Sequence, residues 1–207
     1  MKPSAPSAAT PAPATPARPR PPRAVVMGVS GSGKTTVGQA LADRLGVEYA
    51  DADAFHPAAN IAKMSAGVPL EDDDRAPWLA AIARFLAEHA ETGAVVSCSA
   101  LKRRYRDVLR AGVGRLPFLH LDGSPEVVVE RVAQRSDHFM PASLVTSQFA
   151  DLEPLEADEE GVVTDLSDPV GEVVDRFAAY LTGQAGTPGP SPTPGDPPDA
   201  PSSTRTS

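Results

Sequence analysis

The segment Gly28–Thr35 constrains the fold of this chain more than any other feature. It reads GVSGSGKT and fits the pattern G-x-x-x-x-G-K-[ST]. The wholly apolar run Ala24–Met27 precedes it, and a helical pattern follows it as far as Leu45. A glycine-rich turn between a buried strand and a helix forms a cradle for phosphate, because its backbone N–H groups point inward and the helix N-terminus adds partial positive charge. We call Gly28–Thr35 the phosphate loop.

The phosphate loop predicts binding of ATP with Mg²⁺ and transfer of the γ-phosphate to a small acceptor. Lys34 is expected to reach the β- and γ-phosphates, and Thr35 to ligate Mg²⁺. The chain has no N-K-x-D element to read guanine, and its third apolar run ends in Ser97-Cys98-Ser99 where a motor protein would carry a metal-binding aspartate. A small-molecule kinase is therefore favoured over a GTPase or a motor. The predicted nucleotide-binding residues are Gly28, Val29, Ser30, Gly31, Ser32, Gly33, Lys34, Thr35, Thr36 and Arg131.

Short apolar runs alternate with helical patterns along the chain, which is typical of a parallel sheet covered by helices on both faces. The expected strands are 24–27, 47–50, 94–98, 116–121 and 162–166. The expected helices follow the phosphate loop and cover 57–64, 105–110, 125–135 and 169–181, with a further helix that starts at Pro77 and ends before Gly93. Residues 67–74 and 151–160 are interpreted as acidic loops, and Trp78 as a core residue rather than a ligand.

Proline marks the edges of the domain. Of the 23 prolines, eight lie in residues 1–22 and seven in residues 183–207. These segments cannot bury enough apolar surface to offset chain entropy, so we expect two disordered tails around one domain at 23–182.

Charge and cysteine content restrict the partners. The net charge of −8 argues against nucleic acid, and no run approaches the ~18 apolar residues of a membrane span. The single cysteine, Cys98, fits a cytoplasmic location.

Two aspartates follow the second apolar run. Asp51 and Asp53 are two residues apart, so on an extended chain their side chains would share one face. In a doubly wound sheet this position borders the ligand crevice. We expect Asp51 to serve Mg²⁺ and Asp53 to meet the acceptor hydroxyl and accept its proton; the alternative is an ordinary aspartate turn after a strand.

From about Arg23 to Leu181 the chain resembles the small, thermoresistant-type P-loop gluconokinases, which are related to shikimate kinase. The match rests on GVSGSGKTT (28–36), the D-x-D-x-x-H-P-x-x-N run from Asp51 to Asn60, Lys63-Met64, Gly67, Pro69-Leu70, Asp72, Asp74-Arg75, Pro77-Trp78-Leu79, CSALKRRYRDVLR (98–110), His120-Leu121, His138-Phe139-Met140-Pro141, Ser147-Gln148-Phe149 and Leu152-Glu153. Ala52 and Asp137 depart from it, since the family often carries glycine at both places; Asp137 adds negative charge to the expected lid.

The resemblance implies phosphorylation of D-gluconate by ATP to 6-phospho-D-gluconate, a three-layer α/β/α fold with a five-stranded parallel sheet and a lid segment, and a homodimer. The alternatives are a kinase for another small acceptor, such as shikimate or a nucleoside, and a non-catalytic ATP-binding module.

Gluconate is an anion with many hydroxyl groups, so its site needs a cation and several hydrogen-bonding side chains. The candidate substrate residues are Asp53, His56, Asn60, Lys63, Arg75, Lys102, Arg103, Arg106 and His138. His56, Asn60 and Lys63 fall at helical spacing on one face. Arg75 would clamp the carboxylate or neutralise the acids beside it, and the cluster Lys102–Arg106 is alternatively a solvated helix face.

Arg131 and Arg135 are four residues apart and lead into Ser136–Pro141. We expect this segment to be a lid whose arginines fold over the γ-phosphate, the alternative being helix-end charges that answer the helix dipole. The predicted catalytic residues are Lys34, Asp53 and Arg135.

Overall fold

The computed structural model describes residues 20–133 and 142–183. The expected tails lie almost wholly outside these ranges. None of the helices within them is long and apolar enough to cross a bilayer.

A five-stranded sheet forms the centre of the structure, with the strand order β2-β3-β1-β4-β5 and every neighbouring pair parallel. The strands are β1 (Arg23–Met27), β2 (Glu48–Asp51), β3 (Ala94–Ser97), β4 (Phe118–Asp122) and β5 (Gly161–Asp165). In the register, Val25 of β1 lies opposite Val96 on one side and Phe118 on the other. The predicted parallel sheet is confirmed, with each strand end within two residues of expectation.

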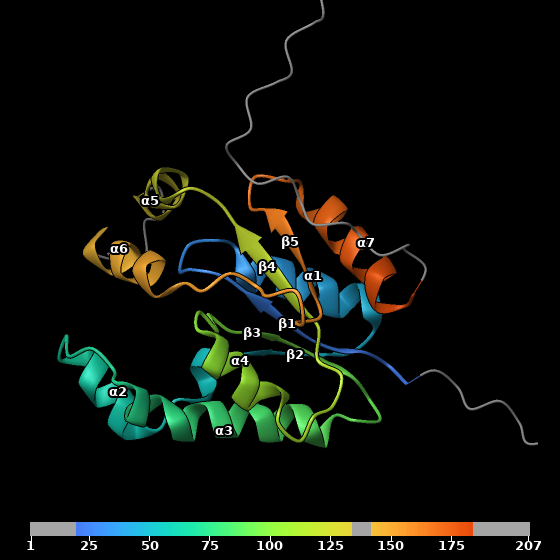
Figure 1. Ribbon diagram of the computed structural model, residues 1–207, viewed down its shortest axis with the longest axis horizontal. Helices are drawn as coiled ribbons and strands as arrows, with labels where there is room; N and C mark the ends of the chain where they lie inside the picture. Colours follow the sequence, from blue (N-terminus) through green and yellow to red (C-terminus); the bar gives the residue numbers. More distant parts are fainter. Residues whose placement is uncertain (1–19, 134–141, 184–207) are drawn as a thin grey trace, which may run out of the picture.

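Helices cover both faces of the sheet (Figure 1). They are α1 (Lys34–Leu45), the 3₁₀ turn η1 (Ala52–Phe55), α2 (Ala58–Ser65), α3 (Asp72–Glu88), α4 (Arg103–Arg110), α5 (Pro125–Ala133), α6 (Ala142–Asp151) and α7 (Val170–Leu181). Helices α1 and α7 pack together on one face, and α3 and α4 on the other. The sequence therefore predicted the three layers correctly, although it did not predict α6.

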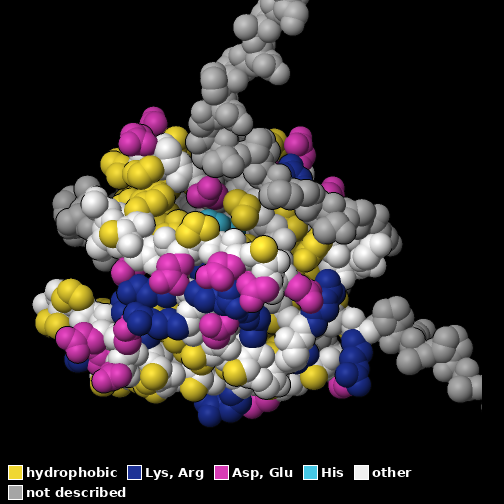
Figure 2. All heavy atoms as spheres, in the orientation of Figure 1, with side chains coloured by type: hydrophobic (Ala, Val, Ile, Leu, Met, Phe, Trp, Pro, Cys, Tyr) yellow, Lys and Arg dark blue, Asp and Glu magenta, His cyan; other side chains and the backbone are white. Residues whose placement is uncertain are grey.

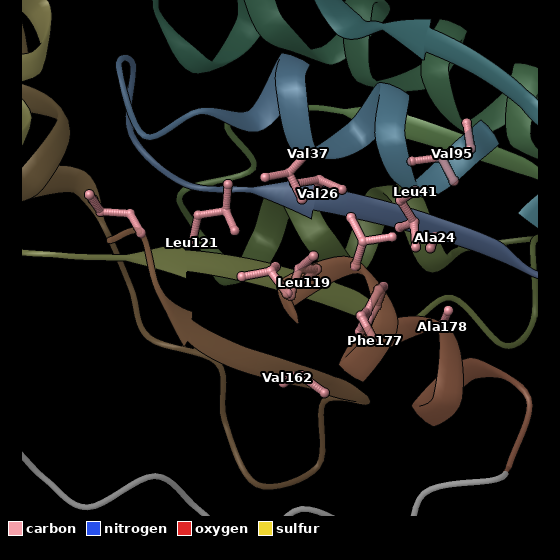
Figure 3. Close-up of a cluster of buried hydrophobic side chains, with 14 of the residues drawn as sticks. Ala24, Val26, Val37, Leu41, Val95, Leu119, Leu121, Val162, Phe177 and Ala178 are labelled. Atoms are coloured by element: carbon pink, nitrogen blue, oxygen red, sulfur yellow. The ribbon is translucent and has the colours of Figure 1, made fainter. Parts of the chain in front are cut away.

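Alternation along β1 divides the buried side chains between two cores. Ala24 and Val26 face α1 and α7, while Val25 and Met27 face α3 and α4. All four are fully buried, as expected for the central strand of a parallel sheet. Figure 3 shows the first of these cores, in which side chains of β1 and β4 meet those of α1 and α7.

Helix α3 begins at Asp72, so the prediction that it starts at Pro77 was wrong. The Oδ2 atom of Asp74 accepts a hydrogen bond from the backbone N–H of Glu71 at 2.9 Å, which satisfies a donor at the helix start. Three aspartates in the first turn also complement the partial positive charge of the helix N-terminus. Pro77 consequently lies inside the helix, and the residues from Asp72 onward do not form a loop.

The segment 151–160 is not a solvated acidic loop throughout, because the side chain of Glu159 is fully buried. Arg106 of α4, also fully buried, donates from Nε and Nη2 to the two carboxylate oxygens of Glu159 at 2.8 and 2.6 Å. Burial alone would raise the pKa of Glu159, but the bonds from Arg106 hold it below the usual value.

The remaining donors of Arg106 meet backbone carbonyls. Its Nη1 atom donates to Ala100, Leu101 and Glu153, and Nη2 to Pro154. The side chain of Arg106 thus connects α4 both to the segment before it and to the segment after α6.

On the surface, Lys and Arg side chains alternate with Asp and Glu in a band at the height of α4 and the chain leading to β5 (Figure 2).

We predict that Arg106→Met lowers the free energy of unfolding by about 3 kcal/mol, because it removes the fully buried partner of Glu159 and leaves its carboxylate only the partly exposed Arg110, at 3.1 Å, and Arg103, at 3.8 Å. Urea unfolding followed by circular dichroism measures this loss. Arg115→Met is the matched control: it breaks the half-exposed pair with Glu160 and should cost less than about 1 kcal/mol. Equal losses in the two variants would contradict the special role of Arg106.

Candidate active site

The phosphate loop joins β1 to α1 at the centre of the sheet. Gly28, Gly31 and Gly33 have φ angles of 142°, 87° and 96°, in the region that favours glycine. A Cβ atom at Gly28 would lie 2.7 Å from the carbonyl oxygen of Leu121. Since β1 lies between β3 and β4, the loop opens at the point where the strand order reverses, which is where doubly wound sheets bind ligands.

Lys34 and Thr35 open helix α1 and face different partners. The Nζ atom of Lys34 donates to the carbonyl oxygen of Val29 at 2.9 Å. The hydroxyl of Thr35 donates to Oδ2 of Asp51 at 3.3 Å. The expected metal-binding pair, Thr35 and Asp51, is therefore brought together by the structure.

This pair suits a small hard cation. Mg²⁺ prefers oxygen ligands and is typically held by one or two protein groups, with phosphates and waters completing its shell. Within residues 20–133 and 142–183 there is no cluster of three or more His, Cys, Asp or Glu residues that could hold a metal by itself. The hydroxyl of Thr35 and the carboxylate of Asp51 therefore fit Mg²⁺ that arrives together with phosphate.

Two hydroxyl groups connect the end of β2 to the start of α1, and the first of them, that of Tyr49, lies 3.4 Å from Oδ2 of Asp51. Tyr49 donates to Ser97 at 3.0 Å, and Ser97 donates to the carbonyl oxygen of Lys34 at 2.9 Å. Burial raises the pKa of Tyr49 above its ordinary value, so its hydroxyl is a donor at neutral and mildly alkaline pH. A Cβ atom at Gly38 would lie 2.6 Å from Ser97 Oγ, so only glycine lets α1 approach β3 this closely.

Asp53 lies on η1 rather than on β2, so the prediction that Asp51 and Asp53 share a strand face was wrong. The Oδ1 atom of Asp51 accepts the backbone N–H of Asp53 at 3.1 Å and thereby begins the 3₁₀ turn. Both sequence interpretations of Asp51 therefore hold at once. Its Oδ1 atom forms the aspartate turn, while its Oδ2 atom faces Thr35 and is placed to serve a metal ion. The turn leaves the side chain of Asp53 exposed.

His56 and Asn60 form a polar wall with α3. The imidazole of His56 stacks on Trp78, with ring centres 4.6 Å apart and planes at 6°. Trp78 is buried, as expected, and donates from Nε1 to the carbonyl oxygen of Ala52 at 2.7 Å. Asn60 is buried and donates to the carbonyl oxygen of Asp74 at 2.8 Å. His56 precedes α2, so this packing, rather than one continuous helical face, brings it to Asn60.

Lys63 completes this side of the site. Its ammonium group pairs with Asp74 at 2.5 Å. Three further cations surround the ring of Tyr105: Arg75, Lys102 and Arg104 lie 5.8, 5.9 and 5.5 Å from its centre. Arg75 also donates to the hydroxyl of Tyr105 at 3.4 Å. Asp72 lies 2.5 Å from Arg104 and 3.9 Å from Arg75, so cations and carboxylates alternate between α3 and the start of α4.

Two predicted substrate residues do not belong to this group. Arg106 is fully buried in its pair with Glu159, so its assignment to the substrate was wrong. The guanidinium of Arg103 is held by Asp107, Glu156 and Asp158 at 2.8–3.1 Å. The structure therefore directs Arg103 toward the acidic segment instead of the acceptor. Lys102 is also paired, with Asp151 at the end of α6, but its ammonium group lies 5.9 Å from the centre of the Tyr105 ring.

A pocket of about 320 Å³ adjoins the phosphate loop on the α7 side. Thr36 and Arg131 line it, as do Leu166 and Asp168 of the connection from β5 to α7. Sequence reasoning placed Thr36 and Arg131 on the nucleotide but missed the connection, because no motif marks it. The position of this pocket beside the phosphate loop suits the nucleoside part of a nucleotide.

Two other predicted residues, Arg135 and His138, lie outside the described residues, as does the expected lid.

Sequence reasoning also gave Gln148 no role. It accepts a hydrogen bond from the backbone N–H of Ser30 at 2.6 Å and donates to the Ser30 hydroxyl at 3.0 Å. Its position in the Ser147-Gln148-Phe149 motif was the signal that could have identified it.

Comparison with known proteins decides the family. The sequence model of shikimate kinase matches residues 30–170. A gluconokinase of Gluconobacter oxydans (strain 621H) is 52% identical over 141 residues, which cover 67% of this chain and 79% of that protein. The chain belongs to the gluconokinases of the shikimate kinase family. The thermoresistant gluconokinase of Escherichia coli (strain K12) is 42% identical over 153 residues, covering 72% of this chain and 87% of that protein.

A solved structure supports the same placement. A gluconokinase from Sinorhizobium meliloti 1021 superposes with a TM-score of 0.70 at 46% identity, covering 82% of this chain and all of that one. The gluconokinase fold predicted from the resemblance is thereby confirmed.

We predict that the stacked ring of His56 reports pH through Trp78, the chain's single tryptophan. Burial disfavours the charged imidazole and lowers the pKa of His56 below 6.5, so the ring is neutral at pH 7. Protonation on acidification should quench Trp78 fluorescence with a midpoint below pH 6.5. His56→Gln should abolish this transition, whereas His89→Gln should retain it. A midpoint at or above the ordinary value would contradict the assignment.

Proposed function

We propose that this gluconokinase-family protein transfers the γ-phosphate of ATP to the 6-hydroxyl of D-gluconate, giving 6-phospho-D-gluconate and ADP. One observation carries the proposal. The phosphate loop, the Thr35–Asp51 pair and the side chains of Lys63, Arg75 and Lys102 all lie at the carboxyl ends of the strands. The names of the relatives support gluconate as the acceptor.

On the nucleotide side, the pocket beside Arg131 would take the nucleoside, and the backbone N–H groups of the phosphate loop would bind the phosphates. Lys34 would leave the carbonyl of Val29 and neutralise charge on the transferred group. Thr35 would hold Mg²⁺ directly, with Asp51 bonded to it or to one of its waters; the bound ion supplies charge neutralisation. Arg135 is proposed to add a second positive charge over the γ-phosphate.

On the acceptor side, Asp53 is proposed to orient the 6-hydroxyl and accept its proton late in the transfer. His56, Asn60 and Lys63 would bind the hydroxyl groups of gluconate, and His138 is proposed to join them. Arg75 and Lys102 are the cations proposed for its carboxylate, because both border Tyr105 on the same side of the site. A planar guanidinium suits a bidentate carboxylate contact best, which favours Arg75.

We further propose that residues 23–182 form the catalytic domain between two disordered tails, and that the protein acts in the cytoplasm as a homodimer. The proline distribution supports the tails, and the single, buried Cys98 supports a reducing compartment. The homodimer rests on the family resemblance.

We predict that ADP release with Mg·ATP requires D-gluconate. A coupled assay with D-gluconate, shikimate, glycerate or no acceptor measures this directly, and removal of Mg²⁺ with a chelator should abolish turnover. ADP formation with shikimate alone would move the proposal to another acceptor, and ADP formation without any acceptor would refute it.

We predict that Asp53→Asn lowers kcat by about 10²-fold, because an amide cannot accept the hydroxyl proton, and changes the KM for ATP by less than about threefold. Asp73→Asn, an exposed position in the first turn of α3, is the matched control and should keep the wild-type kcat. Undiminished kcat in Asp53→Asn would exclude Asp53 as the proton acceptor.

A further inference from the structure

The peptide group between Val29 and Ser30 is held at both of its ends. Its N–H donates to Oε1 of Gln148 at 2.6 Å. Its carbonyl oxygen accepts from Nζ of Lys34 at 2.9 Å and from the backbone N–H of Ser32 at 3.2 Å. A single peptide group therefore connects a side chain of α6 to the lysine of the phosphate loop, across 118 residues of sequence.

Two hydrogen bonds join Gln148 to Ser30, and together they require a side chain with both an acceptor and a donor at position 148. While Oε1 accepts from the backbone of Ser30, Nε2 donates to the Ser30 hydroxyl at 3.0 Å. A primary amide provides an acceptor and a donor side by side, whereas an ionised carboxylate only accepts and an aliphatic side chain does neither. Both bonds thus set the orientation of the Ser30 backbone relative to α6.

Helix α6 is itself firmly supported, so it can hold the loop in place. Val145 on α6 is buried in the core shared with α1 and α7. Just after the helix, the backbone N–H of Glu153 donates to the carbonyl of Leu101 at 2.9 Å, and the carbonyl of Glu153 accepts from buried Arg106 at 3.0 Å.

The neighbouring residue of the loop is held from the other side by α5. A Cβ atom at Gly31 would lie 2.5 Å from Cγ2 of Val132 and 3.4 Å from Cγ1 of Val128. The turn Ser30-Gly31 is thus fixed between α5 and α6, which also pack on each other.

We propose that Gln148 is a positioning residue for phosphoryl transfer, which acts through the Val29–Ser30 peptide on Lys34 and on the shape of the phosphate loop. The N–H bond to Gln148 polarises the peptide and fixes its plane, so its carbonyl presents a defined resting place to the Lys34 ammonium. A loop that is ordered before ATP arrives loses less entropy on binding and places its charges correctly at the transition state.

The test compares Gln148→Leu, which keeps the size of the side chain but loses both bonds, with Gln148→Glu, which keeps the acceptor for Ser30 N–H. Gln39→Leu, at an exposed position of α1, makes the same chemical change as a matched control. Three quantities are measured for each: steady-state kinetics, affinity for Mg·ATP by calorimetry without acceptor, and hydrogen exchange of the Ser30 amide by NMR. Thermal unfolding confirms that each variant is folded at the assay temperature.

For Gln148→Leu we expect kcat to fall at least about tenfold with an unchanged KM for gluconate, the Kd for Mg·ATP to rise roughly threefold, and the Ser30 amide to lose its protection from exchange. Gln148→Glu should keep that protection and most of kcat, while its added negative charge raises the KM for ATP. Gln39→Leu should match the wild type in all three. A merely structural role would lower stability without this separation of kcat from KM.

Two results would overturn the proposal directly. One is a wild-type kcat in Gln148→Leu although its Ser30 amide has lost protection from exchange, and the other is a Ser30 amide that is unprotected in the wild-type protein. A fall in kcat that matches only the fraction of unfolded protein would also overturn it. If Gln148→Leu does not fold, a Gln148→Glu variant that has full kcat and an unprotected Ser30 amide would overturn it instead. The kinetic part rests on the proposed function, but exchange and Mg·ATP affinity need no acceptor. An enzyme inactive on gluconate would therefore refute that function while these two readouts still decide the role of Gln148.

Discussion

The buried ion pair between Arg106 and Glu159 joins α4 to the segment that leads from α6 to β5, and the placement of both depends on it. Two fully buried, oppositely charged side chains are stable only if their remaining hydrogen-bonding groups are also satisfied, and Arg106 meets this condition through four backbone carbonyls. These carbonyls belong to segments before α4 and after α6. The pair therefore sets where α6 sits relative to the sheet, and through Gln148 it bears on the phosphate loop.

The site combines rigid and exposed parts in a way that suits phosphoryl transfer. Backbone geometry and packing fix the phosphate loop, because glycines stand where a side chain would collide or where φ is positive. The acceptor side is built from side chains that end near the surface, such as Asp53 and Lys63. Since phosphoryl transfer requires mainly positioning and charge neutralisation, a firm nucleotide cradle beside a charged, open acceptor side is a consistent arrangement.

The sequence was sufficient for the sheet, its helical layers and the phosphate loop, because these depend on local patterns: apolar runs, helical spacing and a motif with fixed φ requirements. It failed where distant residues decide the outcome. Arg106 was read as a substrate residue since its burial depends on Glu159, 53 positions away. Proline at position 77 suggested a helix start, but the acidic first turn from Asp72 outweighed it. The role of Gln148 likewise follows from a contact between remote segments. The individual roles of the site residues remain predictions.

The burial of Cys98, at the end of β3 beneath the phosphate loop, has a consequence for the chemistry that the protein tolerates. Burial raises the pKa of this thiol to about 12, so at neutral pH almost none of it is present as thiolate. Peroxide, disulfides and electrophiles react with the thiolate, and all of them would have to reach a side chain that is 1% exposed. With no other cysteine in the sequence, the folded protein should therefore resist oxidation at thiols, and Cys98 is not suited to couple its activity to the redox state of its surroundings.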